Sequence, residues 1–130
     1  MTGLRRGPGG GRLRAMRLAL PLLLAAGAAC AGEASVVGGE ARRAGEGWIV
    51  SATARHADEG WEHYADAWRV ETPDGRALGL RELLHPHVEE QPFTRSLSGV
   101  EIPETLDHVI LRARDGVHGW GEGLRLDLPR

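Results

Sequence analysis

The sequence predicts an all-β fold, a small antiparallel β-sandwich that follows an N-terminal signal segment. Three observations support this fold class. Short stretches in which apolar and polar residues alternate recur along the chain, as half-buried strands do. Turns rich in glycine and proline separate these stretches. No stretch after residue 47 has the sustained 3.6-residue apolar period of an amphipathic helix.

Residues 1–31 are predicted to be an export signal and not part of the fold. Five arginines precede an apolar run at 18–29, LALPLLLAAGAA. This run is shorter than the roughly 20 residues of a membrane-spanning helix and matches the core of a signal peptide. Met16 is an alternative start to Met1.

Two ways of cleaving the signal are open. Cys30 stands where a bacterial lipoprotein is cut and lipidated, whereas Ala29-x-Ala31 suits the ordinary signal peptidase. We therefore expect an exported bacterial protein that is either periplasmic or anchored to the membrane as a lipoprotein. Cys30 is the only cysteine, so no internal disulfide can form.

The net charge of residues 32–130 excludes some classes of binding partner. Five of the 16 basic residues, all of them arginine, lie within residues 1–31, and none of the 18 acidic residues does. Residues 32–130 thus carry 11 basic and 18 acidic residues, a net charge of −7. This balance argues against nucleic acid and against an anionic membrane as partners. A membrane contact is expected only through a lipid anchor at Cys30.

The first half of the chain predicts a linker, a strand and a hairpin. Residues 32–47, rich in glycine and alanine, are expected to be a flexible linker, and residues 48–130 to form the sandwich domain. The stretch 48–55 alternates from Trp48 onward and predicts a strand. Residues 64–80 predict a β-hairpin, because Pro73-Asp74-Gly75 has the residues of a tight turn.

The second half predicts shorter elements. Residues 81–88 are expected to form a helical turn or an irregular strand, residues 89–98 a polar loop around Phe93, and residues 99–103 a short extended piece. Residues 108–114 alternate and predict a strand. Residues 115–121 predict a glycine-rich bend, and the alternating leucines at 124–128 predict the last strand.

All six histidines lie in the predicted domain, and their grouping indicates a metal site. His56 and His63 bracket one loop, His85-x-His87 places two rings on one side of an extended segment, and His118 lies in the glycine-rich bend. Loops from several strands gather at one end of a sandwich, and imidazole is the commonest protein ligand for zinc, copper, iron and nickel. We therefore expect the metal ligands among His56, His63, His85, His87 and His118. His108 has no histidine beside it and is left out.

This pattern resembles the iron site of a known family. His56-x6-His63-Tyr64-x3-Trp68, followed by Val117-His118-Gly119-Trp120, is similar to the pattern of the superoxide reductase (desulfoferrodoxin) family. The resemblance implies an immunoglobulin-like sandwich and iron, with His56, His63 and His118 as the imidazole ligands. Beside these three, we expect His85 or His87 to supply a fourth imidazole. The family's cysteine ligand falls at Asp115, so the resemblance does not carry superoxide reductase activity with it, and Asp115 is either a ligand or an acceptor beside one.

A second, shorter resemblance covers the segments HYADAW, HPHVEEQPFTRSLSGV and VHGWG. They are similar to segments of small exported bacterial β-sandwich proteins. This resemblance implies a family and no activity.

Two functions from different classes follow. The first is an exported sandwich that binds a transition metal (copper, zinc or iron, with no other cofactor) and has a redox-related role. The alternative is a non-catalytic interaction domain that binds another exported protein and no metal. Whether the protein is an enzyme stays open.

Two groups of charged residues have two interpretations each. Four carboxylates around His63 either orient imidazoles or face solvent: Asp58, Glu59, Glu62 and Asp66. Arg95 either binds an anion or pairs with Glu89 or Glu90.

Overall fold

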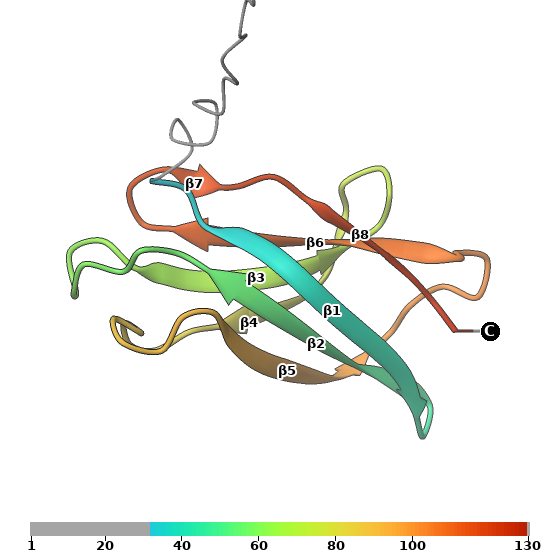
Figure 1. Cartoon of the computed structure of the whole chain (residues 1–130). Coiled ribbons are helices and arrows are strands. Elements are labelled where there is room, and N and C mark those ends of the chain that lie inside the picture. The colour runs from blue at the N-terminus through green and yellow to red at the C-terminus, as the bar shows by residue number, and fades with distance from the viewer. Residues whose placement is uncertain (1–31, 130) are drawn as a thin grey trace, which may run out of the picture.

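Alternating strands build two antiparallel β-sheets that face each other, in a computed structural model that describes residues 32–129 (Figure 1). The first sheet has the order β1-β2-β5, and the second the order β4-β3-β6-β7, with β8 also paired to β6. The strands are β1 (Ser35–Ala44), β2 (Gly47–Arg55), β3 (Ala65–Glu71), β4 (Ala77–Glu82), β5 (Phe93–Val100), β6 (His108–Asp115), β7 (Gly119–Trp120) and β8 (Leu124–Asp127). This strand order is that of immunoglobulin-like sandwiches, so the predicted fold class is confirmed.

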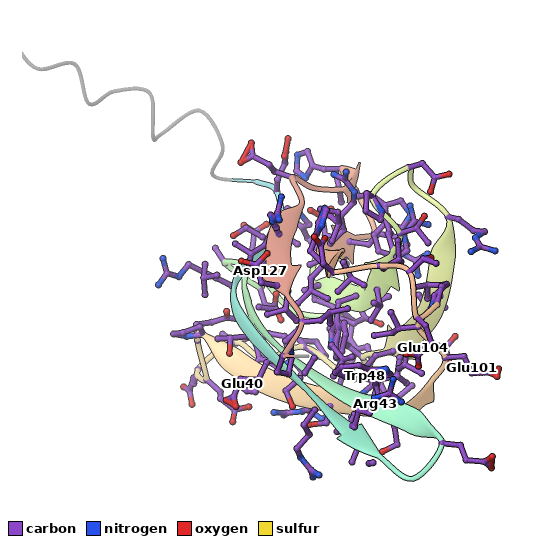
Figure 2. The ribbon with its side chains drawn as sticks, turned by 90° about the vertical axis from the view of Figure 1, so that its right-hand side faces the viewer. Glu40, Arg43, Trp48, Glu101, Glu104 and Asp127 are labelled. Carbon is purple, nitrogen blue, oxygen red and sulfur yellow. The ribbon has the colours of Figure 1, made fainter. Side chains whose placement is uncertain are left out.

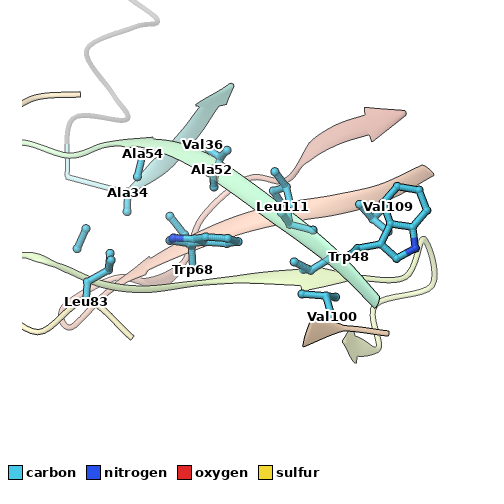
Figure 3. Packing of buried hydrophobic residues seen from close by; sticks show 14 of the residues in the cluster. Ala34, Val36, Trp48, Ala52, Ala54, Trp68, Leu83, Val100, Val109 and Leu111 are labelled. Carbon is cyan, nitrogen blue, oxygen red and sulfur yellow. The ribbon is translucent and has the colours of Figure 1, made fainter. Parts of the chain in front are cut away.

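The core lies between the sheets because each central strand turns every second side chain inward. In β2 these inward residues run from Trp48 to Ala54, and in β6 from Val109 to Ala113; all are buried. Trp68 of β3 lies at the centre with no exposed surface (Figure 3). The strands predicted at 48–55 and 108–114 are thereby confirmed.

The predicted hairpin at 64–80 is also confirmed as β3 and β4. Trp68 pairs with Arg81, and the turn between the strands is closed by the N–H of Thr72, which donates to the carbonyl of Arg76 at 2.9 Å. Gly75 has a φ of 97°, a conformation that side chains with a Cβ rarely adopt. Beyond Glu82 the chain forms neither a helical turn nor a strand up to β5.

The expected linker at 32–47 is wrong, because residues 35–44 form β1 along the edge of the first sheet. In its sequence, SVVGGEARRA, the inward positions carry Val36, Gly39 and Ala41, and these small residues do not form a clear apolar alternation, which hid the strand. A Cβ on Gly39 would lie 2.6 Å from Cδ1 of Leu111 in the opposite sheet. Glycine is therefore what lets β1 pack closely on β6.

The expected polar loop at 89–98 is also wrong over its second half, which is β5. Phe93 is buried and Arg95 and Leu97 are half-buried, whereas the residues between them are exposed. The exposed hydroxyls of Thr94 and Ser96 each lie 2.7 Å from a hydroxyl of β2, namely those of Thr53 and Ser51. The strand was hidden because an arginine occupies an inward position.

The two ends of the sandwich differ in chemistry. At one end, Arg43 of β1 lies over the ring of Trp48, 5.0 Å from its centroid, and pairs with Glu104 (Figure 2). At the other end, the loops 56–64, 83–92 and 116–118 meet, and the chain enters β1 from Gly32. Five of the six histidines lie at this second end, which we call the histidine end.

Candidate metal centre

Asp115 stands at the middle of the histidine end, because β6 finishes there. Its side chain is fully buried, and one carboxylate oxygen, Oδ1, accepts the backbone N–H groups of Val117 at 2.7 Å and His118 at 2.6 Å. Burial raises the pKa of this carboxyl group, but these two N–H groups and the His118 ring outweigh it, so its pKa lies below the usual range. Asp115 is therefore a buried, ionised carboxylate.

Three imidazoles face this carboxylate. Nε2 of His56 lies 3.4 Å from Oδ2, Nε2 of His63 lies 3.4 Å from Oδ1, and Nδ1 of His118 lies 3.2 Å from Oδ2. The rings of His56 and His63 are in edge contact, with centroids 4.7 Å apart. One atom each from His56, His63 and Asp115 form a set in which every pair lies within 4.8 Å.

This spacing is close to that of a metal site. Zinc bonds to nitrogen and oxygen measure about 2.0–2.2 Å, so two ligand atoms on one ion are at most about 4.4 Å apart. In the tetrahedral geometry that zinc prefers, neighbouring ligand atoms are about 3.3–3.6 Å apart. The 3.4 Å distances from Nε2 of His56 and of His63 to Asp115 match this spacing, whereas a pair at the 4.8 Å limit of the set would have to close by about 1.2 Å.

Two further carboxylates fix which ring nitrogen of each histidine faces Asp115. Nδ1 of His56 lies 2.6 Å from Oδ1 of Asp58, and Nδ1 of His63 lies 2.9 Å from Oε1 of Glu59. An ionised carboxylate only accepts, so each Nδ1 carries the proton and each Nε2 presents a lone pair. Carboxylates hold metal-ligating histidines in this way in known sites.

The Nε2 atoms of His56 and His63 both face acceptor oxygens. Nε2 of His56 faces the carbonyl oxygen of Gly32 at 3.2 Å as well as Asp115. Nε2 of His63 is buried and has no hydrogen-bond partner among residues 32–129. The hydrogen bond to Glu59, together with the negative charge of Asp115, raises the pKa of His63. The cluster therefore favours a positive charge at its centre, which either a proton or a metal cation can supply.

His118 forms the solvent side of the cluster, and Gly32 supports it. The His118 side chain is 40% exposed, whereas those of His56 and Asp115 have no exposed surface. A Cβ on Gly32 would lie 2.5 Å from Cε1 of His118, so only glycine lets the chain pass this ring on its way into β1. Because residue 32 was expected to belong to a flexible linker, its place beside the histidines could not be predicted.

His85 and His87 share the histidine end but form a separate pair. Their ring centroids are 4.6 Å apart, and the His87 ring stacks on Phe93 with centroids 3.9 Å apart. Neither belongs to the set of ligand atoms around Asp115. His118 also lies outside that set, but its Nδ1 is 3.2 Å from Oδ2 of Asp115, whereas no such contact joins His85 or His87 to Asp115 among residues 32–129. The geometry therefore does not favour the expected fourth imidazole from this segment.

The four acidic residues near His63 were expected either to orient imidazoles or to face solvent, and the structure shows that two of them contact imidazoles and two do not. Asp58 and Glu59 bond to imidazoles, whereas Asp66 pairs with Arg114 at 2.8 Å and Glu62 is exposed. Asp58 is buried, and its second oxygen accepts the backbone N–H of His87 at 2.6 Å. It thus joins the metal cluster to the neighbouring loop, a role that acidic composition alone does not reveal.

Comparisons with known proteins add one relative. A protein of Halomicrobium mukohataei described as a "Putative lipoprotein" is 52% identical over 58 residues, which cover 45% of this chain and 28% of the relative. The matched segment is thus less than a third of that protein. No family model and no solved structure matches the chain. Within residues 32–129 there is no helix long and apolar enough to span a membrane.

Proposed function

We propose that the protein is an exported, lipid-anchored β-sandwich that binds a divalent transition metal at the histidine end. His56, His63, His118 and Asp115 are the ligands in this proposal. The observation that carries it is the approach of Nε2 of His56 and Nε2 of His63 to 3.4 Å from the buried Asp115 carboxylate, while another carboxylate holds Nδ1 of each ring. The name of the Halomicrobium protein supports export and anchoring, for which Cys30, outside the described residues, is the candidate lipidation site.

The donor set indicates which metals suit the site. Neutral imidazoles with one carboxylate are ligands of zinc, copper(II) and iron(II). The thiolate of the superoxide reductase family has no counterpart here, since Asp115 stands at its position. We therefore propose metal binding and do not extend the proposal to superoxide reduction.

The direct test uses the exported chain from residue 32 onward with Zn²⁺, Cu²⁺ or Fe²⁺ added after treatment with a chelator. We expect one equivalent of metal per chain and a higher melting temperature with metal. His63→Gln removes one ligand and is expected to lower the affinity about 10–100-fold or more. His108→Gln is the matched control, because His108 begins β6 and Asp115 ends it, about 23 Å away at about 3.3 Å per residue. No bound metal in the unmodified chain, or equal losses in both variants, would refute the proposal.

One observation favours the alternative, a domain that binds another exported protein. Four of the six large exposed apolar side chains within residues 32–129 lie on the loops of the histidine end: Trp61, Leu84, Val88 and Val117. If the chain binds no metal, this end becomes the candidate protein interface. In that case Trp61→Ser should abolish binding of the partner protein, and added metal should leave the melting temperature of both the unmodified chain and this variant unchanged.

A further inference from the structure

A second cluster of basic groups lies at the open edge of the sandwich, where β4 of one sheet faces β5 of the other. Arg81 near the end of β4 and Arg95 of β5 line a cavity of about 110 Å³ together with His85 and His87. None of these four residues belongs to the set around Asp115. Edge strands often carry inward-pointing charges that discourage pairing with other chains, and that role accounts for the two arginines by itself. It does not account for the hydrogen bonding inside the cavity.

The protonation of His87 follows from its neighbour. Nη2 of Arg95 lies 3.1 Å from Nε2 of His87. A guanidinium group only donates, so Nε2 accepts and the proton of the neutral ring is on Nδ1. His87 is 5% exposed, and its Nδ1 has no hydrogen-bond partner among residues 32–129. A buried N–H donor therefore lacks an acceptor.

Arg81 presents a second donor of the same kind. Its Nε is buried and has no partner within the described part of the chain. Buried N–H groups are nearly always paired, so two unpaired donors on residues that line the same cavity indicate a missing acceptor. Both unpaired groups are donors, and both belong to residues that line a cavity bordered by two guanidinium groups.

The charges around the cavity favour an anion as that acceptor. Burial, together with the positive charge of Arg95 and the nearby His85, lowers the pKa of His87, so this ring is neutral when the cavity holds no anion. Two carboxylates act against an anion: Glu90 pairs with Arg95 at 3.2 Å, and exposed Glu82 lines the cavity. Arg81 forms no ion pair with a carboxylate among residues 32–129, and its Nε is free to donate a hydrogen bond.

We propose that this cavity binds a small oxyanion, which accepts hydrogen bonds from Nε of Arg81 and Nδ1 of His87. The shared chemistry is a compact group with several acceptor oxygens, either a free inorganic ion such as phosphate or the carboxylate of a small organic acid. Guanidinium groups bind both through charge-assisted hydrogen bonds. The site is independent of the proposed metal centre and stands if that centre fails.

The test titrates the chain from residue 32 onward, at constant ionic strength, with inorganic phosphate, sulfate, acetate and chloride. The readouts are heat of binding and the NMR signal of Nδ1–H of His87. We expect saturable binding of phosphate or acetate, a shift of the Nδ1–H signal and no response to chloride. The two oxyanion classes are distinguished by which of them saturates at the lower concentration.

Arg81→Gln is the informative variant, with Arg76→Gln as a matched loss of charge at the exposed turn of the same hairpin. Loss of one charge-assisted hydrogen bond should weaken oxyanion binding about tenfold or more in Arg81→Gln and leave Arg76→Gln within about twofold. His87→Phe preserves the stacking on Phe93 and should also abolish the response. A response to chloride equal to that of phosphate, equal weakening in the two arginine variants, or no saturation by any oxyanion would overturn the proposal and leave water as the acceptor.

Discussion

At the scale of single residues, carboxylates decide what the histidines can do. The sequence places His56, His63 and His118 in loops, but a histidine becomes a ligand only when its other nitrogen is held. Asp58 holds the ring of His56, and Glu59 holds the ring of His63. Both rings contact the carboxylate of Asp115. Motif spacing predicted that His56, His63, His118 and Asp115 lie close together, as they do, and their binding of a metal stays a prediction. The separation of His87 from them was not predictable, because it depends on stacking with Phe93 in a strand that polar residues concealed.

Asp58 is predicted to support both the fold and the metal centre. Asp58→Asn keeps one acceptor oxygen but cannot satisfy Nδ1 of His56 and the N–H groups of Ala65 and His87 together. We expect a loss of about 1–3 kcal/mol in the free energy of unfolding, since a buried donor is left unpaired. Metal affinity should fall about 10–100-fold. Urea unfolding and metal titration measure the two effects.

The control for this change is Asp66→Asn, which removes a partly exposed carboxylate paired with Arg114. A surface ion pair of this kind contributes about 0–1 kcal/mol. Should both variants lose the same stability and neither lose metal affinity, Asp58 has no special role.

His87 is predicted to make the metal-free protein sensitive to acid. Burial, with Arg95 and His85 nearby, lowers its pKa in the folded state, whereas in the unfolded chain it is about 6.5. The unfolded state therefore binds the proton first, and stability is lost as the pH falls below about 6.5 toward the folded-state pKa. Above about pH 6.5 the residue has no such effect. His87→Phe should lose less stability than the unmodified chain between about pH 8 and about pH 5.

Urea unfolding of protein that has been freed of metal and then of the chelator, in a buffer without oxyanions, measures this difference. The raised pKa of His63 acts in the opposite sense, adding stability below about pH 6.5 that is lost as the pH rises through its folded-state pKa. It is present in both proteins and cancels in the comparison. Parallel pH profiles for the two proteins would contradict the prediction.

At the scale of elements, the strands that could be predicted are those whose inward positions are apolar. β2, β3 and β6 follow this rule, and their alternation indicates them directly. β4 was indicated by the turn at Pro73-Asp74-Gly75, because its own inward positions include Gly79 and Arg81. β1 and β5 break the rule, because glycine and arginine occupy inward positions where contact with the other sheet or with a cavity requires them. β1 and β5 are the edges of the first sheet, where tertiary contacts and not local pattern decide the structure. The two-residue β7 was also missed, because it lies within the expected glycine-rich bend at 115–121.

Gly39 tests whether β1 is an integral strand of the sandwich. Gly39→Ala would place a Cβ 2.6 Å from Leu111 and 3.2 Å from the carbonyl oxygen of Ser51. We expect a loss of about 1–3 kcal/mol in the free energy of unfolding, because buried Leu111 has to move or β1 has to lift away. Thermal and urea unfolding measure the loss.

Gly38→Ala is the matched control one residue earlier. Its Cβ would meet only Thr53, at an ordinary distance of 3.9 Å. Removing the freedom of a glycine in the unfolded chain without a clash stabilises by about 0.4–1 kcal/mol, so this variant should be neutral or slightly stabilised. If Gly39→Ala and Gly38→Ala change the free energy of unfolding by the same amount, Gly39 is not required for the close packing of β1 against β6.

At the scale of the whole molecule, the proposed metal centre joins the two sheets. His56 follows β2 of the first sheet and Asp115 ends β6 of the second. In antibody domains a disulfide links the corresponding pair of strands. The single cysteine of this chain lies at position 30, before the fold, so the described domain has no disulfide. A metal ion at the histidine end would link the same two strands by coordination.

This arrangement predicts how Zn²⁺ changes hydrogen exchange. A ligand that binds only the folded state stabilises it by about 2.7 kcal/mol at a free concentration of 100 times Kd, which for a domain of this size corresponds to a rise of about 10–20 °C in melting temperature. Amides that exchange only through openings that release the ion should then slow about 100-fold. We expect this slowing at the ends of β2 and β6 together, around Ala54 and Arg114, because the ion has to leave before either end opens. The turn at Thr72–Arg76, at the opposite end of the sandwich, can open with the ion in place and should change little. Slowing confined to one sheet would mean that the ion is held by one sheet alone and that the centre does not join them.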